Sequence, residues 1–315
     1  MTCVVFTIGY RPIQRVNTIL RDKQKDVRMI NKKAIATLTT ASLALFSASA
    51  MADSAWNASQ NPIVAANNEI GLAATGTLMN YQEHFATTGV LSAPMDDTES
   101  GWLPGFSVNL SGMNNNLTEN LYLSLNYNYS SAGIAYKGFV YNPGIPNSAR
   151  RADLTDQATT QNFLGKLGKG FSFNNNMMLT PYVAGGFQLW NRQLPGTHER
   201  YHSELVGAGL MYQYAPTARL VLGTDMRVLA LVGGGIKTSQ WSAGFGTSGE
   251  ETVGIHADYK ISGGWHAYGG LNFTHFTYTG TGIVTFYQGA TKYIGKEPPS
   301  STNLLGMSVG LAYSY

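Results

Sequence analysis

The sequence predicts an all-β fold: a closed, antiparallel, up-and-down transmembrane β-barrel of about ten strands. Three observations predict it. Only 12% of the residues are charged, about half the usual fraction, while the chain has 36 glycines and 11% aromatic residues. Many segments alternate apolar and polar residues, which gives a strand one apolar face and one polar face. The connections between these segments alternate between short and long, a pattern typical of barrels that cross a membrane.

Other classes of protein are excluded by the composition. A helical span needs about 20 predominantly apolar residues, and the longest apolar run, 34–50, is shorter and contains Thr and Ser. The 18 Tyr, 13 Phe and 5 Trp are too many aromatic residues for a long disordered chain. A single cysteine excludes a disulfide scaffold.

The N-terminal region predicts an export signal. Asn31–Lys33 is basic, residues 34–49 are apolar, and Ala50-Met51-Ala52 is a small-residue cleavage site. We therefore expect a signal peptide over residues 29–52, cut after Ala52, with a membrane anchor as the alternative. Residues 1–28 are then an upstream extension from a misassigned start codon.

Removal of residues 1–52 changes the charge of the chain. This segment holds eight Lys or Arg and two Asp or Glu, so the formal charge falls from +3 to −3. The basic character belongs to the removed part. The net charge of the remaining chain therefore gives no reason to predict nucleic acid as a partner. Cys3 is removed as well. Residues 53–68 are a polar leader that lies in the periplasm or partly enters the barrel, and residues 69–315 form the barrel.

The alternation is clearest at Asn120–Ser130. Leu121, Leu123 and Leu125 fall on one face, while Ser124 and its even-numbered neighbours fall on the other. The same rhythm predicts strands, in chain order, at Glu69–Asn80, Gly101–Gly112, Asn120–Ser130, Thr159–Phe173, Met178–Trp190, Glu204–Tyr214, Arg219–Leu231, Thr252–Ile261, Trp265–Tyr278 and Leu305–Tyr315. Each is near or above the about 9–11 residues that cross a bilayer at a tilt.

The connections sort into two groups. Short, turn-rich links lie at Asn114–Asn116, Asn174–Asn176, Pro216–Thr217 and Ser262–Gly264. Long polar links lie at Tyr81–Ser100, Val140–Gln157, Asn191–Arg200, Gly233–Gly249 and Gly280–Pro299. Because hydrocarbon offers no hydrogen-bond partners, such a sheet must close on itself. If ten strands is wrong, eight is the next expectation.

The signal peptide, the alternating strands and the closing segment Ser308–Tyr315 resemble the small bacterial outer-membrane β-barrel proteins, the OmpA-like and opacity-type group. The resemblance is one of pattern and covers roughly residues 69–315. It implies a place in the bacterial outer membrane, in contact with lipid and lipopolysaccharide. It also implies that Tyr313 and Tyr315 serve as the C-terminal signal for the barrel-assembly machinery, where that group usually ends in Phe.

Charged residues on the polar faces predict a network in the lumen. His256, Asp258 and Lys260 share one face of a strand, and the neighbouring strand adds Asp225 and Arg227. The full predicted network is Lys166, Asp225, Arg227, His256, Asp258 and Lys260. Barrels of this size are nearly filled by side chains, so we expect a plugged interior of paired charges, with a narrow polar passage as the alternative.

Two apparent motifs do not predict chemistry. Residues 244–249 match G-x-G-x-x-G, but a strand follows instead of the helix that a dinucleotide site needs. Residues 306–310 match G-x-S-x-G, but too few residues follow to supply an acid and a histidine. We expect a loop and a strand at these places, and no catalytic or cofactor-binding residues.

Surface proteases of the omptin family have a similar architecture and carry acids and an Asp–His pair near the outer rim. This resemblance points to Asp96 and Asp97, and to His84, His198 and His202. None of them has the spacing of that family, and His256-x-Asp258 reverses its order. The histidines fit no zinc spacing, and Asp96, Asp97 and Glu99 offer at most a weak surface site for calcium, so no metal or cofactor is expected.

The sequence therefore predicts an outer-membrane barrel with a structural or surface-binding role, carried by its long loops. The ligand of those loops is not predicted. A narrow channel for small solutes is the second hypothesis, a surface protease a more distant third, and a soluble secreted β-protein remains an alternative to all of these.

Overall fold

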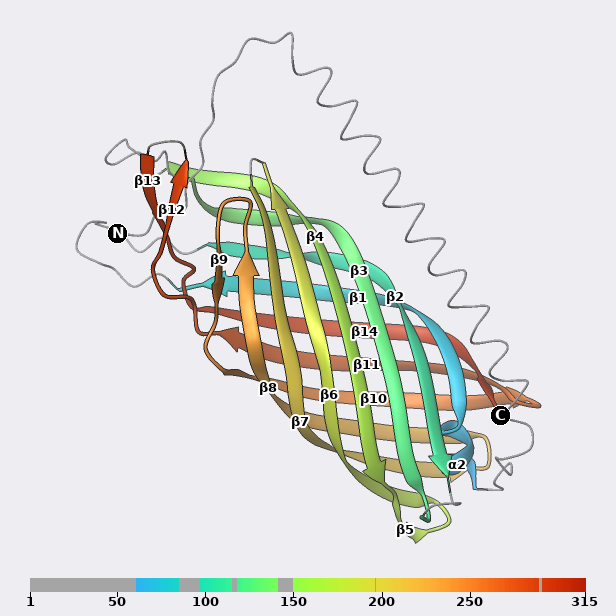
Figure 1. Cartoon of the computed structure of the whole chain (residues 1–315). Helices are drawn as coiled ribbons and strands as arrows, with labels where there is room; N and C mark the ends of the chain where they lie inside the picture. The colour runs from blue at the N-terminus through green and yellow to red at the C-terminus, as the bar shows by residue number, and fades with distance from the viewer. Residues whose placement is uncertain (1–60, 85–96, 115–117, 141–149, 196, 289–290) are drawn as a thin grey trace. The chain divides into compact units, whose positions relative to one another are not determined.

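The computed structural model describes residues 61–84, 97–114, 118–140, 150–195, 197–288 and 291–315. Ten long antiparallel strands form the wall of a barrel (Figure 1). They are β1 (Glu69–Glu83), β2 (Thr98–Asn114), β3 (Leu121–Val140), β4 (Arg150–Lys169), β6 (Met177–Leu194), β7 (Thr197–Thr217), β8 (Leu220–Lys237), β10 (Ser248–Ser262), β11 (Trp265–Tyr278) and β14 (Ser300–Ser314). The predicted fold class and strand number are confirmed.

The sheet closes between its first and last strands. β1 pairs with β14 from Glu69↔Ser314 to Glu83↔Ser300, and with β2 on its other side. Every other wall strand also pairs with the strands before and after it, so the wall has no free edge. Closure satisfies the backbone donors and acceptors that hydrocarbon would leave without partners.

The two-residue alternation has the predicted orientation. On β3, Leu123 is 52% exposed on the outside, whereas Ser124 is buried on the inside. We call the exposed outer residues the apolar band; it comprises Leu72, Leu78, Trp102, Leu123, Leu125, Leu167, Val183, Phe187, Val206, Leu210, Leu222, Met226, Val228, Val253, Ile255, Leu271, Phe273, Leu305, Met307, Val309 and Leu311. So large an exposed apolar surface is typical of a wall that faces lipid.

The two ends of the barrel differ. At the turn end, β7–β8 and β10–β11 are joined by tight connections, and Gly263 has the positive φ of 56° that such a turn favours. The short strand β5 (Phe171–Asn174) follows β4 there and pairs with β6. At the loop end, β9 (Ser242–Gly244) pairs with β8, and β12 (Val284–Gln288) and β13 (Thr291–Gly295) form a hairpin. Figure 1 shows this hairpin projecting from the wall.

Several predicted loops are wrong, because the strands run farther toward the loop end than expected. Asn191–Arg200 was expected to be a long link, but β6 ends at Leu194 and β7 begins at Thr197. Likewise β3 continues to Val140 and β4 begins at Arg150. Beyond the apolar band the outer face also meets polar surroundings, so the alternation that marked the strands disappears although the pairing continues.

The second apparent motif lies in a strand, as expected, whereas the loop expected at the first motif is shorter than predicted. Gly244 ends β9 and Gly249 lies in β10, so no helix follows the glycines. Residues 306–310 lie within β14. Within the described part of the chain, no helix is long and apolar enough to cross a membrane. The predicted extension 1–28 and signal peptide 29–52 lie outside the described residues.

Candidate functional site: the barrel lumen

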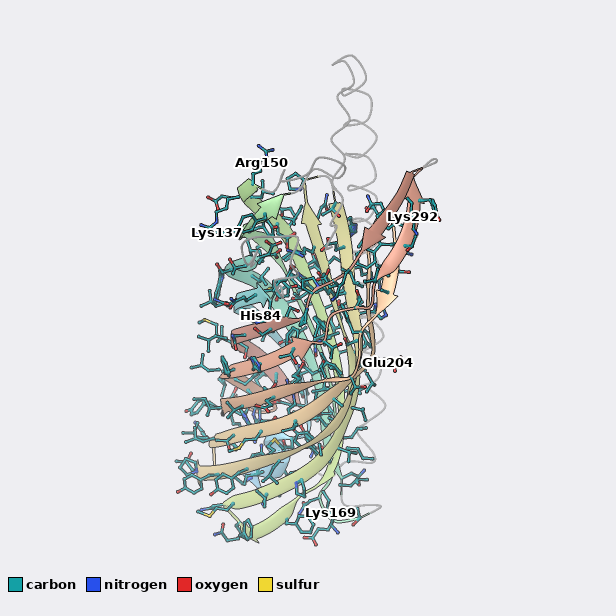
Figure 2. All side chains as sticks on the ribbon, turned by 90° about the vertical axis from the view of Figure 1, so that its left-hand side faces the viewer. His84, Lys137, Arg150, Lys169, Glu204 and Lys292 are labelled. Atoms are coloured by element: carbon teal, nitrogen blue, oxygen red, sulfur yellow. The ribbon has the colours of Figure 1, made fainter. Side chains whose placement is uncertain are left out.

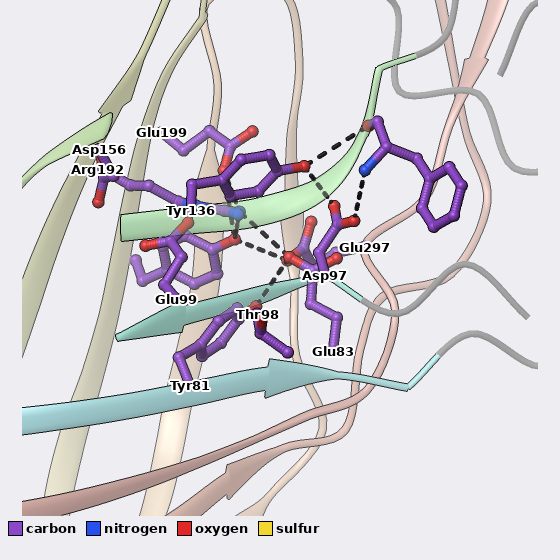
Figure 3. Close-up of polar contacts among 12 residues, drawn as sticks. Tyr81, Glu83, Asp97, Thr98, Glu99, Tyr136, Asp156, Arg192, Glu199 and Glu297 are labelled. Carbon is purple, nitrogen blue, oxygen red and sulfur yellow. Dashed lines mark hydrogen bonds and ion pairs between the residues drawn. The ribbon is translucent and has the colours of Figure 1, made fainter. Parts of the chain in front are cut away.

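The loop end of the lumen contains a buried ion cluster centred on Arg192 of β6. Its Nη1 lies 3.1 Å from Oε1 of Glu83 and 3.0 Å from Oε2 of Glu199, and its Nε donates to Glu99. These acids come from β1, β7 and β2 (Figure 3). One guanidinium thus joins three strands around the lumen.

Further acids surround this centre. Glu297 accepts a hydrogen bond from Tyr201 (2.6 Å), and Asp97 accepts one from Tyr136 (2.7 Å) and one from the Phe139 backbone N–H (2.9 Å). We call the group the Arg192 cluster; its members are Glu83, Asp97, Glu99, Tyr136, Asp156, Arg192, Glu199, Tyr201 and Glu297. The acids outnumber the single arginine, so the cluster cannot hold all of them ionised at low cost.

The Arg192 cluster lies beyond the membrane-spanning part of the wall. On β1 the apolar band ends at Leu78, and Glu83 lies farther toward the loop end. Burial raises the pKa of Glu83 to about 8, and the opposing attraction of Arg192 is the smaller effect. Burial likewise raises the pKa of Glu99 to about 8 against the same attraction. Burial thus favours the neutral forms of these two carboxyls, against the attraction of the arginine.

Aromatic rings form a layer beside the cluster. Trp190 lies 4.8 Å from Tyr81 and 4.9 Å from Tyr201, between ring centroids. Tyr201 stacks on Tyr278 at 5.8 Å, and Tyr278 stacks on Phe245 at 4.8 Å. The Tyr81 and Tyr201 side chains are fully buried. The lumen is thus filled by packed rings at this level.

The middle of the lumen holds part of the predicted charge network. Lys166 Nζ lies 2.6 Å from Asp225 Oδ2, and Tyr182 donates to the other oxygen of Asp225 at 2.7 Å. Arg227 lies 3.9 Å from Asp225 and 3.6 Å from Glu250. Lys166, Asp225 and Arg227 therefore meet, and the sequence analysis missed Tyr182 and Glu250.

Asp258 and Lys260 do not contact that group, whereas His256 interacts electrostatically with Asp225 and Lys166 without a hydrogen bond or ion pair to them in the described structure. His256 lies against Gly223, where an added Cβ would come within 2.2 Å of its ring. Asp258 contacts His266 instead of His256, with 2.5 Å between Oδ1 and Nδ1. Lys260 lies opposite His266 in the strand register. The outcome reflects position along the strands: these residues lie nearer the turn end than Asp225 does.

The turn end of the lumen is covered by the segment that precedes β1. Its short helix α2 (Pro62–Ala66) begins after Asn61, whose side chain accepts from the Ile63 N–H. After the helix, Asn67 donates to Gln213 at 2.7 Å, and Asn68 exchanges two hydrogen bonds with the Met113 backbone. This part of the expected leader is thus bound to β2 and β7 inside the barrel.

A cavity lined by both polar and apolar side chains lies in the lumen between these two levels. Its volume is about 430 Å³, which holds on the order of ten waters. Trp190 and Tyr278 line it toward the loop end, and Ala66 and Asn67 line it toward the turn end. The cavity is therefore bounded by the aromatic layer on one side and by the α2 segment on the other.

Those residues singled out by the protease hypothesis that the structure describes form no Asp–His pair at the rim. Asp97 is engaged by Tyr136, and His84 contacts Ser301 Oγ at 3.2 Å. His198 and His202 are exposed on the outer face of β7, away from the buried acids. Asp96 lies outside the described residues. Glu99, named with Asp96 and Asp97 as a weak calcium site, is buried against Arg192.

The C-terminal strand ends in the predicted aromatic residues. Tyr313 is 43% exposed on the outer face and packs against Trp265 with 5.4 Å between ring centroids. Tyr315 follows the last residue of β14. The pair Trp265–Tyr313 lies at the turn-end border of the apolar band, where aromatic girdles form.

Comparison with solved structures shows the fold. The chain is similar to the outer membrane protease OmpT of Escherichia coli, with a TM-score of 0.56 at 10% identity over 79% of this chain and 97% of that one. Lower similarities, with TM-scores of 0.37 and 0.31, are to the β domain of the Bordetella autotransporter BrkA (11% identity; 79% and 100% covered) and the Ralstonia pickettii toluene transporter TbuX (7%; 81% and 92%). No family model and no curated protein matches the sequence. The chain has the fold of a bacterial outer-membrane β-barrel.

Proposed function

We propose that the protein is an outer-membrane β-barrel with a closed lumen, which acts through the surface at its loop end. The observation that carries this proposal is the Arg192 cluster, which ties β1, β2, β6 and β7 together beside a packed aromatic layer. Because these contacts hold the ends of the four strands together, we expect the outer surface at this end to keep one conformation. The proposal includes export by the signal peptide 29–52 and assembly through the terminal aromatic residues Tyr313 and Tyr315.

The outer face beyond the apolar band suggests a partner. Lys137 of β3 and Arg151 of β4 are exposed on neighbouring strands there, and Arg150 lies at the same end (Figure 2). Lys169 is exposed at the opposite end. Arg and Lys side chains bind phosphate well. We therefore propose that this surface binds the phosphate groups of lipopolysaccharide.

Charge reversal tests the proposed surface. We expect Lys137→Glu with Arg151→Glu to weaken binding of the folded protein to lipopolysaccharide micelles severalfold, because two favourable contacts become repulsive. Lys169→Glu at the turn end is the matched control and should leave binding unchanged. Equal binding by the native protein and the double variant, measured by light scattering or fluorescence anisotropy, would contradict the proposal.

A narrow channel is the second candidate, and the cavity of about 430 Å³ in the lumen favours it. Under the closed-lumen proposal, the native protein inserted in a planar bilayer shows no steady openings. The altered mobility of the unheated protein on a gel, recovered from vesicles of the same lipid, demonstrates that it is folded and inserted. Steady openings of the native protein would favour the channel.

A surface protease is the remaining alternative. We propose instead that the protein has a non-catalytic role. The support is that Asp97 is bound by Tyr136 and the Phe139 N–H, while His198 and His202 lie on the outer face. A protein that cleaves basic peptides, and loses this activity on Asp97→Ala, would overturn it.

A further inference from the structure

Three side chains with metal-ligating atoms meet inside the barrel near its turn end. They are Glu69 of β1, Asp258 of β10 and His266 of β11, and one ligand atom from each lies within 4.8 Å of the others. All three side chains are more than nine-tenths buried, with exposed fractions of 6%, 6% and 2%. The cluster is separate from the Arg192 cluster and from the Lys166–Asp225 pair.

Barrel closure brings these residues together. β14 separates β1 from β11, and the inward position between them is Ala312, which pairs with both Gly71 and His266. Because Ala312 and Gly71 have small side chains, Glu69 and His266 can approach each other across β14. The residues are 8 to 197 positions apart in the sequence, so spacing along the chain could not predict the cluster.

Each of the three side chains has a buried polar atom without a hydrogen-bond partner. Glu69 Oε2, Asp258 Oδ2 and His266 Nε2 are buried and accept or donate no hydrogen bond within the described structure. The imidazole is held through Nδ1, which lies 2.5 Å from Asp258 Oδ1. Because Nδ1 and Nε2 point in divergent directions, an ion bound together with Asp258 must be bound by Nδ1, in place of the proton that Nδ1 and Asp258 Oδ1 share.

The charge of the cluster also calls for a cation. Two carboxyl groups are buried together, and within the described residues no lysine or arginine nitrogen lies within 4.0 Å of either one. Buried carboxylates without a cationic partner are costly. Glu69 and Asp258 both line the internal cavity, where water can complete the coordination of an ion.

We propose that Glu69, Asp258 and His266 form a binding site for a first-row divalent transition-metal ion such as Zn²⁺. One imidazole nitrogen and two carboxylate oxygens suit such an ion, with water in a remaining position. Imidazole is a poor ligand for Ca²⁺ and Mg²⁺, which prefer oxygen donors alone. An ion held here links β1 to β10 and β11 on either side of β14, next to the point where the barrel closes.

Calorimetric titration tests the site on the full chain without an affinity tag, folded in detergent and dialysed against a chelator. We expect one Zn²⁺ per chain, with at least a tenfold loss of affinity in Glu69→Gln and in His266→Ala. His256→Ala is the matched control, because it removes another inward imidazole that lies outside the cluster, and it should bind Zn²⁺ like the native protein. The mobility of unheated samples on a gel shows that each variant is folded.

Cobalt gives a second readout. Co²⁺ bound at this site should show visible absorption bands that disappear in His266→Ala and persist in His256→Ala. Absence of stoichiometric binding, or binding that survives both Glu69→Gln and His266→Ala, would overturn the proposal. Equally tight binding of Ca²⁺ that His266→Ala leaves unchanged would overturn the assigned class of metal.

Discussion

Replacement of Arg192 by Met should lower the free energy of unfolding by about 3–5 kcal/mol, because it leaves several buried acids without their cation. The side chain that remains fills similar space but forms no ion pair with Glu83, Glu99 or Glu199. Unfolding in urea, followed by tryptophan fluorescence, measures the change. Arg200→Met is the matched control: Arg200 is exposed on the outer face of β7 at the same end, and its loss should cost less than about 1 kcal/mol.

The effect of Arg192→Met should depend on pH. The raised pKa values of Glu83 and Glu99, about 8 in the folded protein, mean that their neutral forms are favoured there. Stability from this source is complete below the ordinary carboxyl pKa of about 4.5 and is lost as the pH rises toward 8. Without the arginine these pKa values rise further and the loss extends to higher pH, so the variant should be closest to the native protein near pH 5. A deficit that is the same from pH 5 to pH 9 would contradict the assigned role.

Arginine at Val309 should destabilise the protein in a bilayer by about 2–4 kcal/mol, the cost of a charge on the lipid face near the midplane of a barrel. Val309 is 68% exposed and lies in the middle of the apolar band on β14. Unfolding from lipid vesicles in urea measures the difference. Asn80→Arg is the control, since Asn80 is exposed on the outer face of β1 beyond Leu78 and should cost about 0–1 kcal/mol. Equal costs at the two positions would show that Val309 does not face hydrocarbon.

The wall could be predicted from sequence because the bilayer imposes a simple rule on it. Leu121 to Ser130 must alternate if one face meets lipid and the other meets the lumen. Beyond the apolar band that rule no longer applies, and the strand ends at Val140, Arg150, Leu194 and Thr197 were missed for this reason.

The Arg192 cluster was missed for the same reason, because it lies beyond the apolar band. Arg192 was assigned to a long link, although it continues the inward positions of β6 after Trp190. The even-numbered residues of β6 point inward, and extending this pattern from Trp190 to Arg192 would have placed a buried arginine in the lumen. Its partners Glu83, Glu99 and Glu199 come from other strands, and only the register of a closed barrel shows that they meet.

The Lys166–Asp225 pair was easier to anticipate, because both residues lie within the region of clear alternation. The partner of Asp258 was not: His256 shares its strand, but His266 on β11 is the residue in contact. Neighbours on one strand face are about 7 Å apart, whereas side chains on paired strands approach more closely.

Site-directed spin labels at positions 123 and 124 test the lipid-facing wall most directly. The chain has one cysteine, Cys3, so a Cys3→Ser background with Leu123→Cys or Ser124→Cys gives one label each. In lipid vesicles the label at 123 should collide readily with oxygen and poorly with a polar nickel reagent, and the label at 124 should be shielded from lipid. A label at 123 that is accessible to the nickel reagent, or packed against protein, would contradict the membrane barrel.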